Sequence, residues 1–148
     1  MKKHLLAVAA IALSLNGYAA DDAAWMRYCS ISPDGSTIAF TYKGDIYTVP
    51  SSGGRAFQLT TNDAHDTRPI WSPDGKRIAF ASDRLGGMDI YVVDKNGGVP
   101  VRLTTHSGNE TPLTFKDNEH VYFLANIMPS VEDVQIASSQ FPQVYEVS

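Results

Sequence analysis

Short runs of alternating hydrophobic and polar residues fill most of the chain after residue 24. A period of two residues is typical of half-buried β-strands, and the apolar positions are rich in β-branched and aromatic residues. The runs STIAFTY, KRIAFAS and EHVYFLA each place an aliphatic residue and a phenylalanine on one face: Ile38 and Phe40, Ile78 and Phe80, Val121 and Phe123. Runs that follow them do the same with Tyr47 and Val49, Tyr91 and Val93, Tyr145 and Val147. No window shows a convincing helical period, so the pattern predicts an all-β protein.

The same unit is written twice with regular spacing. Ser-Pro-Asp-Gly at 32–35 recurs at 72–75, and Ile-Ala-Phe at 38–40 recurs at 78–80, an interval of 40 residues. Asp-Ile-Tyr at 45–47 recurs at 89–91, and Leu-Thr-Thr at 59–61 recurs at 103–105, an interval of 44. The second copy has therefore gained four residues where TYKG became ASDRLGGM, and we expect this insertion in a loop.

A weaker third copy follows. TFKDNEHVYF matches WSPDGKRIAF, Pro112 matches Pro69, and QVYEVS matches DIYVVD. Residues 115–118 then stand in place of Ser-Pro-Asp-Gly, and Asn118 is expected to take a positive φ in the turn. An eleven-residue insertion lies within residues 126–143, where it would pack over a neighbour, contact a substrate or be disordered.

A repeat of 40 to 44 residues with about four short strands has the size of a propeller blade. The sequence predicts a partial β-propeller with two complete four-stranded blades and an incomplete third, in units of about 25–61, 62–105 and 106–148. Blades bury their faces only against other blades, and closed propellers have at least four. We therefore expect the chain to be a fragment of a longer protein or a truncated gene product, and self-assembly of three-blade pieces is a further alternative.

The first residues have the pattern of a secretory signal peptide. A positive start, MKKH, precedes the apolar run LLAVAAIALSL, and small residues at 17 and 19 predict cleavage after Ala19. The propeller portion is then 20–148, in a protein exported to the periplasm or secreted, with no later membrane anchor. The formal net charge of −4 and the scattered basic residues argue against a nucleic-acid partner.

Candidate chemistry is sparse. No G-x-S-x-G motif occurs. Loops after Leu-Thr-Thr would bring five residues to one propeller face: Asp63, His65, Asp66, His106 and Glu110. Solvated loops, a partner or substrate contact, and a metal or catalytic site are all open interpretations, and no motif spacing enforces the last. We assign no catalytic, cofactor-binding or metal-binding residue and expect no cofactor.

Three smaller expectations concern single residues. Asp66 and Asn109, one blade apart, are expected to cap local turns, and Asp83 to cap its own hairpin turn. Cys29, the single cysteine, is expected to be a half-buried strand thiol without an internal disulfide.

The repeat SPDG…IAF…DIY…GG…LT resembles the propeller repeat of TolB and related periplasmic proteins. The longer stretch 43–93, KGDIYTV through DIYVV, resembles the N-terminal propeller of secreted, tricorn-like serine proteases of bacteria. That resemblance implies a propeller followed by a PDZ domain and a C-terminal serine peptidase domain. No catalytic motif of that family has a matching position in this chain.

The resemblance implies a propeller segment that serves substrate admission or protein docking and is not itself catalytic. Its expected partners are peptide or protein substrates, the protein's own missing C-terminal domains, or further copies of the full-length protein in a homo-oligomer. Two alternatives stay open: a TolB-like periplasmic scaffold that binds envelope proteins, and a propeller fused to another hydrolase such as an amidohydrolase.

Overall fold

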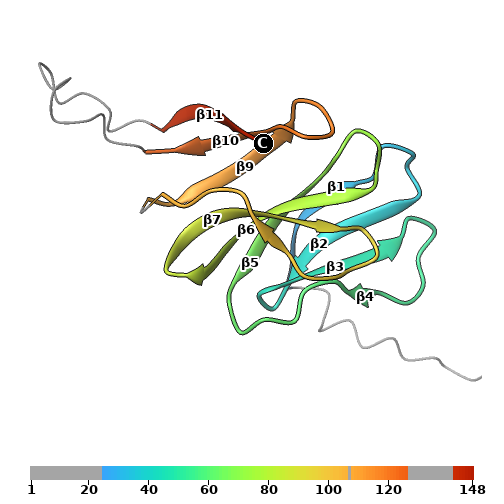
Figure 1. The fold of residues 1–148 in the computed structure, drawn as a ribbon. Coiled ribbons are helices and arrows are strands. Elements are labelled where there is room, and N and C mark those ends of the chain that lie inside the picture. Colours follow the sequence, from blue (N-terminus) through green and yellow to red (C-terminus); the bar gives the residue numbers. More distant parts are fainter. Residues whose placement is uncertain (1–24, 107, 127–141) are drawn as a thin grey trace, which may run out of the picture.

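The computed structural model describes residues 25–106, 108–126 and 142–148. Within these ranges the regular elements are strands, arranged in three antiparallel sheets of four, four and three strands (Figure 1). The first sheet has the order β1-β2-β3-β4 (Met26–Ile31, Thr37–Tyr42, Asp45–Pro50, Phe57–Gln58). The second has the order β5-β6-β7-β8 (Asp66–Trp71, Arg77–Leu85, Gly87–Asp94, Val101–Arg102). The third has the order β11-β10-β9 (Gln143–Val147, Val121–Ala125, Glu110–Phe115).

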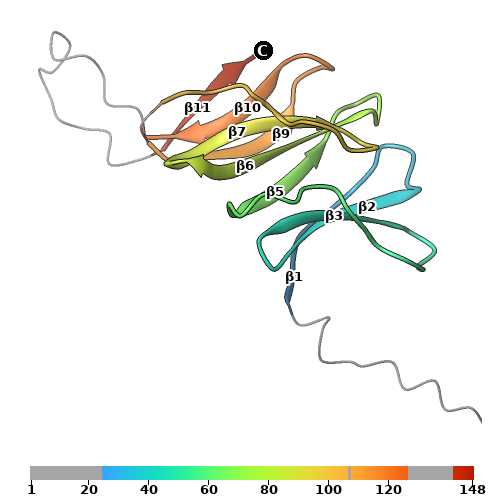
Figure 2. The ribbon, with the colours of Figure 1, turned by 60° about the horizontal axis from the view of Figure 1, so that its bottom comes forward.

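The three sheets follow one another in chain order, and each packs on the next (Figure 2). Their first strands, β1, β5 and β9, contact one another in succession. This arrangement of small sheets, each made from consecutive strands, is that of propeller blades. The all-β fold and the partial propeller are therefore confirmed, and the three sheets are called blades 1, 2 and 3 below.

Ser-Pro-Asp-Gly forms the tight turn between the first two strands of blades 1 and 2. In blade 2, Ser72 Oγ donates to Asp74 Oδ1 at 2.7 Å and accepts the Arg77 N–H at 3.0 Å. Gly75 has φ of +65°, a conformation that costs glycine little. Blade 1 repeats these bonds around Ser32 and Asp34.

The corresponding turn of blade 3 is one residue shorter than expected. Register pairs Trp71 with Ile78 in blade 2 and Phe115 with Val121 in blade 3, so Phe115 matches Trp71 rather than Ser72. The turn closes through the Lys116 N–H, which donates to the His120 carbonyl at 2.9 Å.

Asp117 replaces the missing serine and glycine in this shorter turn. Its carboxylate accepts the N–H groups of Glu119 and His120, each at 2.8 Å. The expected positive φ at Asn118 is wrong, because the described non-glycine residues with positive φ are Tyr28, Lys43 and Arg68.

A β-bulge distorts the first strand of each blade. Tyr28 (φ +53°) and Arg68 (φ +57°) occupy the same place in the bulges of blades 1 and 2. In blade 3, Thr111 pairs with Leu124 as Thr67 pairs with Ala81, so Pro112 matches Arg68. The match of Pro112 with Pro69 is therefore wrong by one residue. Proline cannot take a positive φ, and the bulge of blade 3 takes another form.

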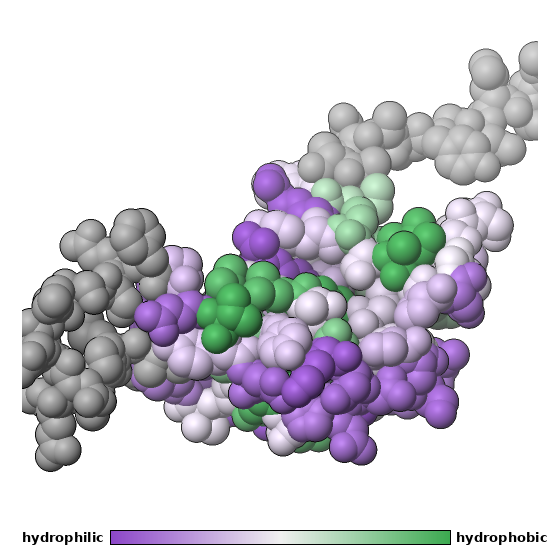
Figure 3. All heavy atoms as spheres, turned by 90° about the horizontal axis from the view of Figure 1, so that it is seen from above, coloured by the Kyte–Doolittle hydropathy of each residue, from purple (hydrophilic) through white to green (hydrophobic). Residues whose placement is uncertain are grey.

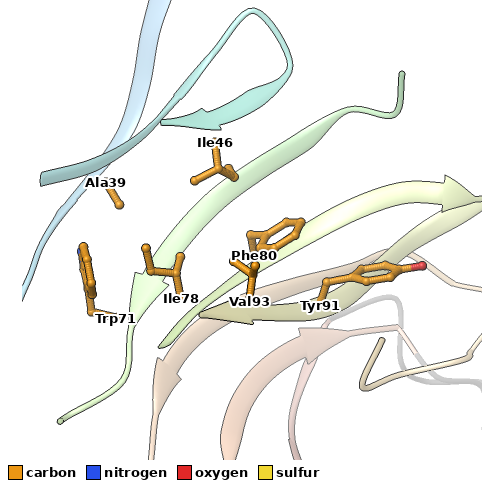
Figure 4. Close-up of a cluster of buried hydrophobic side chains, with 7 residues drawn as sticks. All are labelled: Ala39, Ile46, Trp71, Ile78, Phe80, Tyr91 and Val93. Carbon is orange, nitrogen blue, oxygen red and sulfur yellow. The ribbon is translucent and has the colours of Figure 1, made fainter. Parts of the chain in front are cut away.

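Two hydrophobic clusters hold the blades together. Blade 1 contributes Ala39 and Ile46 to the first cluster, and blade 2 contributes a row of larger side chains with Trp71 at one end and Tyr91 at the other (Figure 4). The second cluster joins the other face of blade 2 to blade 3, and its buried members are Ala79, Ile90, Phe115, Val121, Phe123 and Ala125. At each seam, small and aliphatic residues of the earlier blade meet a face of the later blade that carries aromatic residues.

The four-residue insertion of blade 2 extends a hairpin instead of forming a loop. Strand β6 runs to Leu85, which pairs with Gly87 around Gly86 (φ +114°), past a bulge after Ser82. The larger insertion expected within residues 126–143 lies almost entirely outside the described residues. Cys29 is exposed, so the expectation of a half-buried thiol is wrong.

Candidate functional site

The β2–β3 and β6–β7 hairpins and the links from each blade to the next lie on one side of the molecule. We call this side the hairpin face (residues 43–44, 60–66, 83–88, 104–106 and 108–110). The Asp66 N–H donates to the Gly44 carbonyl at 2.6 Å, which ties the link before β5 to the β2–β3 hairpin. The opposite side, the Pro-Asp-Gly face, carries the turns at 32–36 and 72–76 and the links at 51–56 and 95–100.

Three acidic side chains are almost fully buried near the hairpin face. Asp66 begins β5, Asp89 lies near the start of β7, and Glu110 begins β9. Burial of an unpaired carboxylate is costly, so such groups need a cationic or hydrogen-bonding partner. The partners differ among the three acids, two of which belong to blade 2 and one to blade 3.

Asp66 forms an ion pair with Arg84. Arg84 Nη2 lies 2.9 Å and 2.8 Å from the two carboxylate oxygens, and its Nε donates to Ser82 Oγ at 2.8 Å. The guanidinium also lies over the Tyr91 ring, 4.6 Å from the centroid. Asp66 therefore does not cap a local turn, and the inserted residues of blade 2 supply its counter-ion.

Asp89 is paired with Arg102 of β8, whose Nη2 donates to Oδ2 at 2.7 Å. This hydrogen bond raises the pKa of Arg102, and burial raises the pKa of the neighbouring Tyr91 hydroxyl. Asp89 Oδ1, Tyr91 Oη and Arg102 Nε are buried without a protein partner. This side-chain hydrogen bond adds to the backbone pairing that joins the short strand β8 to β7.

Glu110 contacts Thr104, the central residue of the second Leu-Thr-Thr. Thr104 Oγ1 also accepts the Ile90 N–H at 2.8 Å, and Thr60 accepts the Ile46 N–H at 3.0 Å in blade 1. Burial is the main cause that raises the pKa of Glu110, and the nearby Asp89 charge adds to it. The threonine of each Leu-Thr-Thr therefore accepts a hydrogen bond from the backbone of the third strand of its blade. The threonine after β8, Thr104, also contacts the Glu110 carboxylate of blade 3.

The remaining predicted residues have local structural roles. Asp83 Oδ1 accepts the His65 N–H at 2.7 Å, so it fastens the preceding link and does not cap its own turn. Asn109 Oδ1 accepts the Met88 N–H at 3.2 Å and joins blade 3 to blade 2, which corrects its expected capping role. His106 Nδ1 accepts the Gly108 N–H at 3.1 Å.

The described residues of this face do not assemble a metal centre. No group of three or more His, Cys, Asp or Glu side chains in the described ranges is placed to hold a metal ion. The charge of Asp63, the fifth residue of the predicted cluster, adds to the raised pKa of Asp45. Desolvation is the larger cause of that shift, followed by the charge of Asp66.

The sequence did not indicate a groove on the Pro-Asp-Gly face, at the seam between blades 1 and 2. It has a volume of about 430 Å³ and an apolar wall that includes Phe57, Leu59 and Trp71. Lys95 and Asn96 of the link after β7 complete it. The signal that would have found it is Trp71, an aromatic residue at the end of β5 where blade 1 has Ile31.

Of the exposed large hydrophobic residues elsewhere, four lie on or directly before β1 and the others are spread over several elements. Leu113 and Val144 are exposed on blade 3, and Figure 3, which views the molecule from above Figure 1, shows separate green patches among hydrophilic side chains. No helix in the described part of the chain is long and apolar enough to cross a membrane. The groove is thus the described feature that best combines concavity with apolar walls.

The blade-like sheets, their repeated turns and their interlocked faces define a β-propeller domain. Residues 23–148 match the family described as the tricorn protease N-terminal beta propeller domain, and the chain belongs to that family. The chain is a propeller domain of tricorn and TolB type in a peptidase-related family.

Individual relatives agree with this assignment. The chain is 42% identical over 109 residues to dipeptidyl-peptidase 5 of Porphyromonas gingivalis, covering 66% of this chain and 16% of that protein. It is 35% identical over 58 residues to tricorn protease homolog 1 of Streptomyces coelicolor, covering 39% of this chain and 5% of that protein. The structure of a TolB from Agrobacterium tumefaciens matches with a TM-score of 0.63 and 27% identity, covering 68% of this chain and 38% of that one. The chain therefore spans only a small part of the length of the two curated relatives, 16% and 5%, and 38% of the TolB chain.

Proposed function

We propose that this chain is a propeller segment of an exported, tricorn-like serine protease, and that it admits or docks peptide and protein substrates without catalysing their hydrolysis. The family match over residues 23–148 carries the proposal. Two of its relatives are named as peptidases, and the chain corresponds to only 16% and 5% of their lengths. In this proposal the catalytic residues belong to another part of the protein.

The use of the polar residues supports a binding role over a catalytic one. Asp66 is buried and paired with Arg84 within blade 2, and Glu110 is buried against Thr104 at the junction of blades 2 and 3, so both carboxylates are engaged inside the fold. A general base needs access to the proton that it removes. The groove at Trp71 faces solvent. The bulges in the first strands of blades 1 and 2 form a second accessible surface, where the Arg68 guanidinium lies 4.3 Å from the Tyr28 ring centroid.

Two assays of the purified chain test this function. Incubation with an unfolded protein and with a mixed peptide library is expected to yield no new termini by mass spectrometry, whereas fluorescein-labelled unfolded polypeptide is expected to gain anisotropy as it binds. Hydrolysis that copurifies with the chain through several columns would contradict the non-catalytic role. Absence of any polypeptide binding would contradict the docking role.

A TolB-like scaffold that binds folded envelope proteins is the second candidate, because the A. tumefaciens TolB structure shares the fold at 27% identity. The same anisotropy assay separates the two. A scaffold is expected to bind folded envelope proteins more tightly than unfolded polypeptide, and the protease propeller is expected to show the reverse preference.

Export is part of the proposal, with residues 1–19 as the signal peptide. Expression of the chain in a Gram-negative host is expected to give a periplasmic product whose first residue is Ala20, read by N-terminal sequencing. A cytoplasmic product that retains Met1 would contradict export.

A further inference from the structure

We propose that the groove between blades 1 and 2 binds an extended peptide segment in which a large apolar side chain stands next to an Asp or Glu side chain. The inference rests on the proposed docking function and deepens it by naming the site and the class of ligand. The groove of about 430 Å³ has the size of small-ligand sites in proteins.

The walls of the groove are held in place before any ligand binds. Trp71 is 9% exposed, and its Nε1 donates to the Ser30 carbonyl at 3.1 Å, which fixes the orientation of the indole. The Leu59 N–H donates to the Ile46 carbonyl at 2.7 Å. A preformed apolar wall lowers the entropic cost of binding.

Phe57 gives the groove an accessible aromatic residue. It lies on β4 with 60% of its surface exposed, although it is one of the largest side chains of blade 1. Exposed aromatic residues beside a buried tryptophan have the composition of binding hot spots. An apolar ligand side chain between Phe57 and Trp71 would cover both rings.

Strand β4 favours an extended ligand. It has two residues and is the last strand in the order of its sheet, so in the described chain no strand pairs with its outer edge. Backbone N–H and C=O groups at such an edge can pair with an added peptide. The edge and the apolar wall together accept a peptide whose side chains alternate between groove and solvent.

The positive charge at the groove favours a ligand in which an acidic residue stands next to the apolar side chain. Lys95 is exposed, and among the described residues that line the groove it alone carries a charge. Its backbone is fixed, since its N–H donates to the Lys76 carbonyl at 2.8 Å. The hydrogen bond from Ser32 is the main cause that lowers the pKa of Asp34 in blade 1 to about 2, and the charge of Lys95 also contributes, so Asp34 stays ionised. Lys95 would then lie between the carboxylate of Asp34 and that of the ligand.

Trp71 supplies a direct readout of binding. The chain has two tryptophans, so the Trp25→Phe variant leaves Trp71 as the only one. Titration of this variant with acetyl-Thr-Ser-Leu-Glu-Thr-Ser-amide is expected to change the Trp71 emission in a saturable way. The same peptide with lysine in place of glutamate is expected to bind at least about threefold more weakly, because it faces Lys95 with a like charge.

Substitutions in the groove, each with a matched control, test whether Phe57 and Lys95 contribute to peptide binding. Phe57→Ala is expected to weaken the peptide about tenfold, and Val101→Ala, at the equivalent exposed position of β8, is expected to have no effect. Lys95→Glu is expected to weaken it about fivefold, and Lys76→Glu, outside the groove lining, to change it less than twofold. Circular dichroism and urea midpoints equal to those of the parent show that each variant is folded.

The outcomes separate this inference from the proposed function. Anisotropy that reports polypeptide binding, with no Trp71 response and no loss in Phe57→Ala, would overturn the groove and leave the docking function in place. Absence of binding in both assays would overturn both. A peptide that ends in a free C-terminal leucine and has no acidic side chain is expected to bind more weakly than the glutamate peptide; if it binds more tightly, the proposed ligand class is wrong.

Discussion

At the scale of the residue, buried acids with distinct partners explain how the links between blades are fixed. Asp66 is fully buried, and the Arg84 guanidinium forms a two-oxygen contact with it from the extended hairpin of blade 2. Removal of one partner from a buried pair leaves an uncompensated charge. The strength of this pair is therefore testable against an exposed pair in the same protein.

The Arg84→Met variant is expected to lower the free energy of unfolding by about 3 to 5 kcal/mol, because Asp66 loses its counter-ion. Lys116→Met, which removes the exposed pair with Glu146, is expected to leave stability unchanged within error. Urea unfolding followed by circular dichroism measures both. Equal effects of the two substitutions would contradict the structural role assigned to Arg84.

The burial of Glu110 predicts a pH dependence of stability. Its folded-state pKa is raised above the ordinary 4.5, so in the interval just above pH 4.5 the folded protein holds a proton that the unfolded chain releases. Its contribution to stability is therefore fully present below pH 4.5 and is lost as pH rises through the raised pKa.

The Glu110→Gln variant is expected to lack this component. In urea unfolding between pH 4 and 8, the stability of the parent relative to the variant is expected to fall as pH rises. Glu146→Gln, at a more exposed position, serves as the control and is expected to follow the parent. Parallel curves for the parent and Glu110→Gln would show that the carboxyl titrates normally.

At the scale of the element, each blade presents a row of larger side chains to the small and aliphatic residues of the blade before it. Phe80 is fully buried between blades 1 and 2 and stacks on Tyr91 at a centroid distance of 6.0 Å. Val144 of β11 lies on a sheet face that no described blade covers. Packing between blades should therefore dominate the cost of substitution.

The Phe80→Ala variant is expected to lose about 3 to 5 kcal/mol of unfolding free energy through lost burial and a residual cavity. Val144→Ala is expected to stay within about 0.5 kcal/mol of the parent. Thermal or urea unfolding of both variants measures the difference. A small loss in Phe80→Ala would mean that the blades do not pack as described.

The repeat was sufficient to predict the strands and the propeller architecture, because Ser72, Asp74 and Gly75 carry turn chemistry that acts locally. The residue-by-residue match of blade 3 to blade 2 was not predictable in the same way. The third turn is one residue shorter, which moves Phe115 into the place of Trp71 and Pro112 into the place of Arg68.

Partners of single polar residues were missed for a related physical reason. Asp66 and Asn109 have the composition of turn caps, yet their partners, Arg84 and Met88, are on other strands. Sequence spacing does not encode such tertiary contacts. The groove at Trp71 was missed because it forms only where residues of two blades meet.

At the scale of the whole molecule, the chain is a set of propeller blades whose outer faces differ. Ala39 and Ala79 line the blade faces that receive a neighbour, and Tyr122 takes the matching position on blade 3. Lys116 also pairs with Glu146 across that face, at 2.9 Å. This face of blade 3 is therefore more polar and bulkier than the matching faces of blades 1 and 2.

We propose that these blades belong to an exported tricorn-like serine protease. Sequencing the source DNA through and beyond the codon for Ser148 tests this proposal. We expect an open frame that continues into further blades and then into PDZ-like and serine peptidase regions. A frame that leads into a different enzyme, or that contains no peptidase region, would contradict it.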